Sequence, residues 1–226
     1  MASAKVSRKE LLKKPDEFIT FSAKTIIFAR EHSQQFKYLG IGIIALIFVF
    51  LGINMYMKYI NKKGQTAFNE AYYTLVGDVS QSGNTLDLKK VEELFNAVID
   101  NYSISKSALL TLPELGYVNF KQKKYDEAIS RYQMFLDKAP DDPYISLARI
   151  GLAVCYEEKG DFDKAIQSLE YIRQGPDDFF KEQAMLSLAR VYRLTRKEEK
   201  SNEILKEFIE KFSTSPFLSI AKAYIK

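Results

Sequence analysis

The side chains that most often carry out enzyme chemistry are scarce in this sequence. The chain has one cysteine, Cys155, and one histidine, His32, among its 226 residues. A catalytic triad needs a histidine beside its nucleophile, and a structural zinc site needs about four ligands. The sequence also lacks a glycine-rich phosphate-binding loop. These absences predict a protein that is not an enzyme and holds no cofactor or metal, with Cys155 as a small packing residue.

Side chains that recur at a regular spacing along the sequence indicate a different role, the recognition of another protein. Aromatic, acidic and basic groups occupy equivalent places about 36 or 37 residues apart. The candidates are Tyr117, Phe120 and Lys121, then Val154, Glu157 and Glu158, then Arg190 and Arg193. On repeated helical hairpins they would line a concave groove, which suits an extended peptide or a helix of a partner protein. The alternative is that Val154 is packed and the charged groups form a solvated face.

The elements that would position these side chains are repeated hairpins of two helices. A leucine followed by a small residue recurs in register at Leu115-Gly116, Leu152-Ala153 and Leu188-Ala189. The small residues are expected where the two helices of a hairpin cross closely. Ala128 and Ala165 are expected to be small because the next unit packs against the second helix there.

The units differ in how closely they follow the pattern. Gly160 is expected to end the first helix of the middle unit, where a left-handed conformation is common. Lys123 takes that place in the first unit, and Pro113 is expected to disturb the first helix of that unit. The third unit has Glu198 and Ser201 in place of the aromatic residue and the alanine.

An uncharged stretch of 20 residues, from Tyr38 to Met57, precedes the repeats. As a helix it would rise roughly 30 Å, which matches the hydrocarbon core of a bilayer. Its apolar part is too long for a cleaved signal peptide, and no small-residue cleavage site follows it. The sequence therefore predicts an uncleaved signal-anchor helix rather than a core helix or a signal peptide.

The charge distribution predicts the orientation of this helix. The tail before it has eight Lys or Arg residues, whereas Lys58, Lys62 and Lys63 are the basic residues just after it. Residues 64–226 have 22 basic and 25 acidic residues, so the net charge of +4 comes from the region near the membrane. By the positive-inside rule, the tail is expected in the cytoplasm and the repeats outside it. No nucleic-acid or small-molecule partner is expected.

The predicted fold class is all-α, with one N-terminal transmembrane helix followed by an α-solenoid of tetratricopeptide-like helical hairpins. Residues 1–37 are expected to form a basic cytoplasmic tail, with either an interfacial helix or a short helix without a fixed partner. Residues 38–60 are expected to form the signal-anchor helix and residues 61–226 the repeat domain. Within that domain, hairpins are expected at about 64–104, 105–140, 143–176 and 179–213, before a capping helix at 216–226.

The repeat resembles the tetratricopeptide repeat, a helix-turn-helix unit with a nominal period of 34 residues. The whole layout resembles the bacterial YfgM-like family of ancillary SecYEG translocon subunits, and the repeats are also similar to those of CpoB and of outer-membrane assembly lipoproteins. This resemblance implies an inner-membrane protein with periplasmic repeats that meet the Sec translocon, chaperones or exported clients. The alternative function is a structural scaffold of another envelope complex, in cell division or outer-membrane assembly, that uses its convex face or an end.

Overall fold

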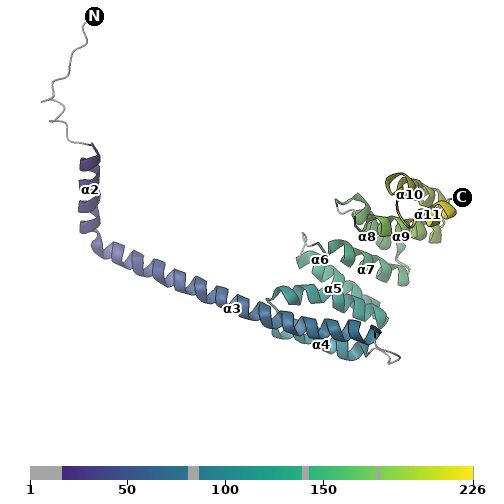
Figure 1. The fold of residues 1–226 in the computed structure, drawn as a ribbon, viewed down its shortest axis with the longest axis horizontal. Helices are drawn as coiled ribbons and strands as arrows, with labels where there is room; N and C mark the ends of the chain where they lie inside the picture. Colours follow the sequence, from purple (N-terminus) through teal and green to yellow (C-terminus); the bar gives the residue numbers. More distant parts are fainter. Residues whose placement is uncertain (1–16, 81–86, 139–142, 177–178, 226) are drawn as a thin grey trace, which may run out of the picture. The chain divides into compact units, whose positions relative to one another are not determined.

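The computed structural model describes residues 17–80, 87–138, 143–176 and 179–225, all of whose regular elements are helices. The first two helices are α2 (Glu17–Glu31) and α3 (Ser33–Ser80), the second of which is 48 residues long. The chain divides within α3 into two compact units, Met1–Tyr56 and Met57–Lys226. Figure 1 shows the order of the helices along the chain.

The first unit contains the apolar stretch of α3. Among the described residues, α3 is the one helix that is long and apolar enough to cross a membrane, and the side chains of its most apolar part are exposed. The helix continues beyond the apolar stretch into residues of the second unit. Residues 1–16 of the expected tail lie outside the described residues, and α2 begins at Glu17.

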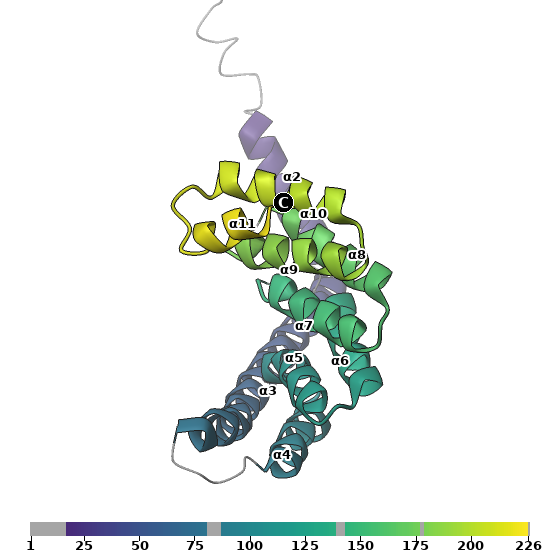
Figure 2. The ribbon, with the colours of Figure 1, turned by 90° about the vertical axis from the view of Figure 1, so that its right-hand side faces the viewer.

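The second unit is an α-solenoid, which confirms the predicted fold class. Each helix after α3 packs against the next one, and α5 also contacts α7 (Figures 1 and 2). The helices are α4 (Leu88–Asn101), α5 (Lys106–Lys121), α6 (Tyr125–Lys138), α7 (Ile145–Glu158), α8 (Phe162–Gln174), α9 (Lys181–Leu194), α10 (Glu198–Lys211) and α11 (Leu218–Tyr224).

The C-terminal part of α3 belongs to the solenoid. Ala71 and Leu75 of α3 are buried in one cluster with Phe95 of α4 and Leu115 of α5. Nearer the apolar stretch, the Oδ1 atom of Asn61 accepts a hydrogen bond from the backbone N–H of Lys106 at 2.9 Å. Burial of the aliphatic and aromatic side chains on one side of α3 fixes this helix as the first layer of the repeats.

The remaining hairpins share a second, larger core. Its buried members include Phe135, Leu169, Leu188 and Phe208, all at 2% exposure or less. Cys155 belongs to it, as expected for a packing residue, and burial together with the charge of Glu158 raises the pKa of its thiol to about 12. The small residues of the repeat pattern are buried in this core, as expected for positions where helices pack closely. Four of them are at most 2% exposed: Ala128, Ala153, Ala165 and Ala189.

The turns inside the α5–α6, α7–α8 and α9–α10 hairpins have the same geometry, although only one of these three turns has glycine at its left-handed position. Lys123, Gly160 and Arg196 all have positive φ, at 61°, 75° and 59°. The residue after each of them donates a backbone hydrogen bond to the carbonyl five residues earlier, at 2.8–2.9 Å, which is the Schellman pattern. The hydrogen bonds that this turn satisfies outweigh the cost of a left-handed lysine or arginine.

The expectation that Pro113 disturbs its helix is wrong. Helix α5 runs without a break from Lys106 to Lys121, and Pro113 is buried within it. The helix is packed on both sides of the proline, by Leu112 and Leu115, which are 3% and 0% exposed. Tertiary packing of these neighbours holds the helix despite the missing backbone donor.

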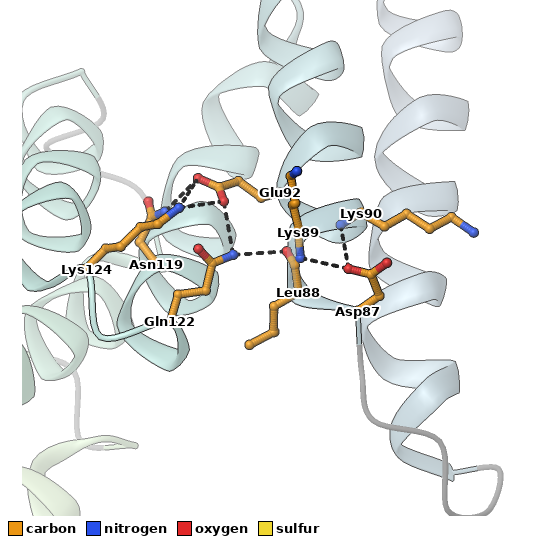
Figure 3. Close-up of polar contacts among 8 residues, drawn as sticks. All are labelled: Asp87, Leu88, Lys89, Lys90, Glu92, Asn119, Gln122 and Lys124. Atoms are coloured by element: carbon orange, nitrogen blue, oxygen red, sulfur yellow. Dashed lines mark hydrogen bonds and ion pairs between the residues drawn. The ribbon is translucent and has the colours of Figure 1, made fainter.

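A polar cluster holds the α5–α6 turn against α4 (Figure 3). The Glu92 carboxylate accepts hydrogen bonds from Asn119 Nδ2 at 3.0 Å, Gln122 Nε2 at 3.0 Å and Lys124 Nζ at 3.0 Å. Gln122 also donates to the backbone carbonyl of Leu88. Burial raises the pKa of Glu92, but the hydrogen bonds from these three groups outweigh that effect, so the pKa lies below its ordinary value.

Candidate protein-binding groove

A groove of about 530 Å³ lies along helices α3, α5 and α7 of the solenoid. Most of the side chains that line it are aliphatic or aromatic, and they come from residues up to 82 positions apart in the sequence. They are Tyr72, Leu75, Val76, Pro113, Glu114, Tyr117, Phe120, Tyr132, Leu147, Ile150, Gly151 and Val154. Because apolar concave surfaces with a few polar groups are typical of ligand sites, this groove is the leading candidate for a binding site.

The groove includes the apolar members of the predicted set. Tyr117 and Phe120 lie one turn apart on α5 and line the groove together with Val154 of α7. Tyr117 is 43% exposed and Leu147 is 42% exposed, so apolar surface in the groove is available to a partner. Val154 is therefore part of the groove surface, although it is also half-buried.

Tyr132 of α6 also reaches the groove, and its side chain passes through a gap that two glycines leave between α5 and α7. A Cβ atom on Gly116 of α5 would lie 2.8 Å from the Tyr132 ring, and one on Gly151 of α7 would lie 2.4 Å from its Cζ atom. Real Cβ atoms do not approach so closely, so the ring occupies space that any other residue at these two positions would fill. Tyr132 is only 5% exposed, yet it contributes to the groove lining.

Glu114 is the one charged residue in the groove lining, among the residues that the structure describes. It is half-buried, and burial raises the pKa of its carboxyl group. Sequence reasoning missed Glu114, Tyr132 and Gly151 as site residues. The signal that could have revealed the close approach of Tyr132 is the pair of glycines, Gly116 and Gly151, 35 residues apart on the first helices of successive units.

The predicted acidic groups bind other side chains of the solenoid. Glu157 accepts hydrogen bonds from both terminal nitrogens of Arg190, at 2.6 and 2.9 Å, which joins α7 to α9. Glu158 accepts a hydrogen bond from the Tyr125 hydroxyl at 3.2 Å. Glu157 of one unit and Arg190 of the next therefore neutralise each other's charge.

The predicted basic groups lie outside the apolar groove. Arg190 and Arg193 line a separate pocket of about 540 Å³ at the C-terminal end, with Leu194, Ile220 and Tyr224. The guanidinium of Arg193 lies over the ring of Tyr224, 4.5 Å from its centroid. Lys121 is exposed and lines neither of these two pockets. The predicted set therefore does not form one continuous surface, because some of its members line the groove, some line the C-terminal pocket, and Lys121, Glu157 and Glu158 line neither.

The described residues contain no group of three or more His, Cys, Asp or Glu side chains that could hold a metal ion. The Nδ1 atom of His32 donates a hydrogen bond to the backbone carbonyl of Phe28 at 3.0 Å, and the imidazole ring packs on the Phe28 ring. The groove offers a ligand apolar surface and the Glu114 carboxylate, and the C-terminal pocket offers the guanidinium groups of Arg190 and Arg193 beside Glu198.

The comparisons with known proteins agree with this architecture. Residues 32–185 match a family described as Tetratricopeptide repeat-like domain, and residues 183–215 match Tetratricopeptide repeat. No curated protein sequence matches the chain.

Several solved structures share the fold at low sequence identity. A tetratricopeptide repeat protein from Parabacteroides merdae is 16% identical with a TM-score of 0.59, and the match covers 73% of this chain and 59% of that one. MamA from Desulfovibrio magneticus is 14% identical with a TM-score of 0.54, over 68% of this chain and 77% of that one. A Podosopora anserina structure with nearly identical TPR-like repeats is 15% identical with a TM-score of 0.57, over 73% and 84% of the two chains.

Proposed function

Because the chain belongs to the tetratricopeptide repeat-like domain family, whose fold is suited to protein–protein interaction, we propose that it is a membrane-anchored binding protein. In this proposal, α3 crosses the bacterial inner membrane once, the tail lies in the cytoplasm and the repeats lie in the periplasm. The solenoid then binds protein partners as an ancillary factor at the Sec translocon or in periplasmic chaperone and envelope assembly.

One observation carries the binding part of this proposal: the apolar groove along α3, α5 and α7. Soluble surfaces seldom leave contiguous aromatic and aliphatic groups open unless they are covered in a complex. Three successive layers of the solenoid contribute to the groove, so it can follow an extended segment or a short helix over several residues.

The membrane part of the proposal is supported by composition. The apolar stretch of α3 has the length of a bilayer core, and basic residues flank it on both sides. A reporter that is active only outside the cytoplasm, fused after Lys226, should be active. Activity of a cytoplasm-only reporter at the same position would invert the topology and remove the periplasmic role.

The Sec-related role is supported by the resemblance of the layout to the YfgM-like family, and it is tested by crosslinking in cells. A photoreactive amino acid at Tyr117, in the groove, should capture a subunit of the translocon or a periplasmic chaperone. The matched control is Met134, a 36% exposed residue of the second helix α6 that does not line the groove. Equal capture of the same protein from both positions, or capture from neither, would contradict binding in the groove.

A second function, a structural scaffold, is favoured by the C-terminal end of the solenoid. Leu194, Phe217, Ile220 and Tyr224 are all between 45% and 58% exposed there, beside the second pocket. A scaffold subunit could use this end to contact another envelope protein. A photoreactive residue at Ile220 that captures a partner, while Tyr117 captures none, would support this alternative.

A further inference from the structure

Two polar groups in the groove along α3, α5 and α7 have no partner among the residues that the structure describes. The Glu114 carboxylate makes no hydrogen bond or ion pair there, and neither does the Tyr132 hydroxyl. Both residues line the same groove. An unpaired carboxylate next to apolar groups is unfavourable, because burial removes water that would otherwise solvate its charge.

The position of the Tyr132 hydroxyl depends on the two glycines described above. A Cβ atom on Gly151 would lie 2.6 Å from this oxygen, and one on Gly116 would lie 2.8 Å from the ring carbons. Tyr132 begins on α6, so its side chain must pass between α5 and α7 to contribute to the groove. The hydroxyl of this 5% exposed side chain thus ends at the groove without a partner among the described side chains, where a ligand can form a hydrogen bond with it.

The pKa values of both Glu114 and Tyr132 are raised, and Glu114 contributes to the shift of Tyr132. Burial raises the pKa of Glu114, and no cationic side chain among the described residues opposes that effect. Burial is also the main reason that the pKa of Tyr132 lies far above its ordinary value, and the charges of Cys155 and Glu114 add to that effect. The hydroxyl therefore stays neutral and can accept a hydrogen bond, and a cationic donor placed beside Glu114 would oppose the effect of burial and favour the ionised carboxylate.

We propose that Glu114 and Tyr132 together bind the ammonium or guanidinium group of a lysine or arginine that lies within an otherwise apolar segment of a partner protein. The inference rests on the proposed function of the groove and adds the chemistry of the ligand. A cation is the complement of one carboxylate in an apolar lining, whereas a divalent metal would need several more oxygen ligands. The apolar flanks of the segment would cover exposed Tyr117 and Leu147.

The test measures binding of short peptides to the full chain held in lipid nanodiscs. Each peptide has nine residues, is fused to a soluble carrier, and has leucine and phenylalanine around one central residue. That residue is lysine, arginine, glutamine or glutamate, and empty nanodiscs give the background. A charge-assisted hydrogen bond in a partly buried site should favour the lysine and arginine peptides over glutamine about ten- to hundredfold.

Variants of the chain show whether this preference comes from the two groups. Glu114→Gln should bring the lysine and glutamine peptides to within about twofold of each other, and Tyr132→Phe should reduce the preference in part. The control is Glu93→Gln, which removes the same charge from an exposed position of α4 outside the groove and should leave the preference intact. Glu114→Lys should prefer the glutamate peptide. Circular dichroism melts of all variants report whether the fold is kept.

The outcomes separate this inference from the proposed function. Binding of all four peptides with equal affinity would keep the groove as a binding site and overturn the role of Glu114 and Tyr132. Binding of none would contradict both. Concentration-dependent self-association of the chain that Glu114→Gln abolishes would make a second copy the occupant, and would overturn the partner segment.

Discussion

Adding one methyl group at Gly151 tests the packing on which the groove depends. In Gly151→Ala the new Cβ would lie 2.4 Å from Cζ of Tyr132 and 2.6 Å from its hydroxyl oxygen. Ordinary carbon contacts are about 3.5–4.0 Å, so the ring would have to move by roughly 1 Å. It cannot move directly away, because Gly116 of α5 lies close to the same ring on another helix.

Two opposing terms set the size of the effect. Overpacking of this kind costs about 1–3 kcal/mol, whereas replacing glycine by alanine within a helix gains about 0.8–1.0 kcal/mol. Gly151→Ala should therefore lower the free energy of unfolding by roughly 0–2 kcal/mol. In a Tyr132→Leu background the conflicting ring atoms are absent, and the same change should stabilise the chain by up to about 1 kcal/mol.

The assay is a double-mutant cycle on the full chain, with denaturant unfolding followed by circular dichroism. The expected coupling between positions 132 and 151 is about 1–3 kcal/mol. Gly77→Ala is the control, because a Cβ there meets nothing within 4 Å. If Gly151→Ala had the same effect in both backgrounds, the Tyr132 ring would not lie against Gly151, and the route of its hydroxyl into the groove would be wrong.

Three other changes test separate parts of the solenoid. Ala165→Trp should destabilise the domain by more than about 3 kcal/mol, because the position is 0% exposed, and a melting temperature within a degree of wild type would contradict the repeat alignment. Arg190→Glu should cost about 1–2 kcal/mol in unfolding free energy, because it places a like charge beside Glu157, whose side chain is 9% exposed. Arg193→Glu should cost less than about 1 kcal/mol, since it loses one contact with an aromatic ring, and equal costs would count against the ion pair. Because the pKa of Glu92 is lowered in the folded state, its carboxylate stabilises the fold at pH values above the ordinary pKa of a glutamate, and this stability is lost as the pH falls through the lowered pKa. Glu92→Gln should therefore make the stability of the chain depend less on pH in the acid range. An unchanged dependence of stability on pH would contradict the role of the cluster.

The Arg190 prediction differs from the expectation that the sequence alone supports. On the repeat pattern, Arg190 and Arg193 lie on one side of a helix, and reversal of both charges would be expected to leave the fold intact. The structure pairs Arg190 with Glu157 across 33 residues, so its reversal also affects stability. Loss of partner capture by that variant would therefore not identify a binding surface unless its melt were unchanged.

Several features of this protein follow from the sequence because their causes are local. The period of Leu-small pairs predicts the hairpins, since each unit needs a small residue where its helices cross. The turns at Lys123, Gly160 and Arg196 can be placed by alignment, because the end of a helix is set by a few consecutive backbone hydrogen bonds. The length and composition of one uncharged stretch are likewise enough to mark a candidate membrane helix, and the phase of α5 is enough to place Tyr117 and Phe120 on one face.

The tertiary structure decided which of those side chains are available to a partner. The sequence placed Glu157 and Arg190 as separate groups on a groove, but helices of neighbouring units lie close enough for the two to bind each other. It gave no reason to connect Glu114 on α5 with Tyr132 on α6, because that connection requires two glycines on different helices to leave room for one ring. Periodicity reports the direction in which a side chain points from its own helix, whereas the partner that it meets depends on the distance between helices, which only packing sets.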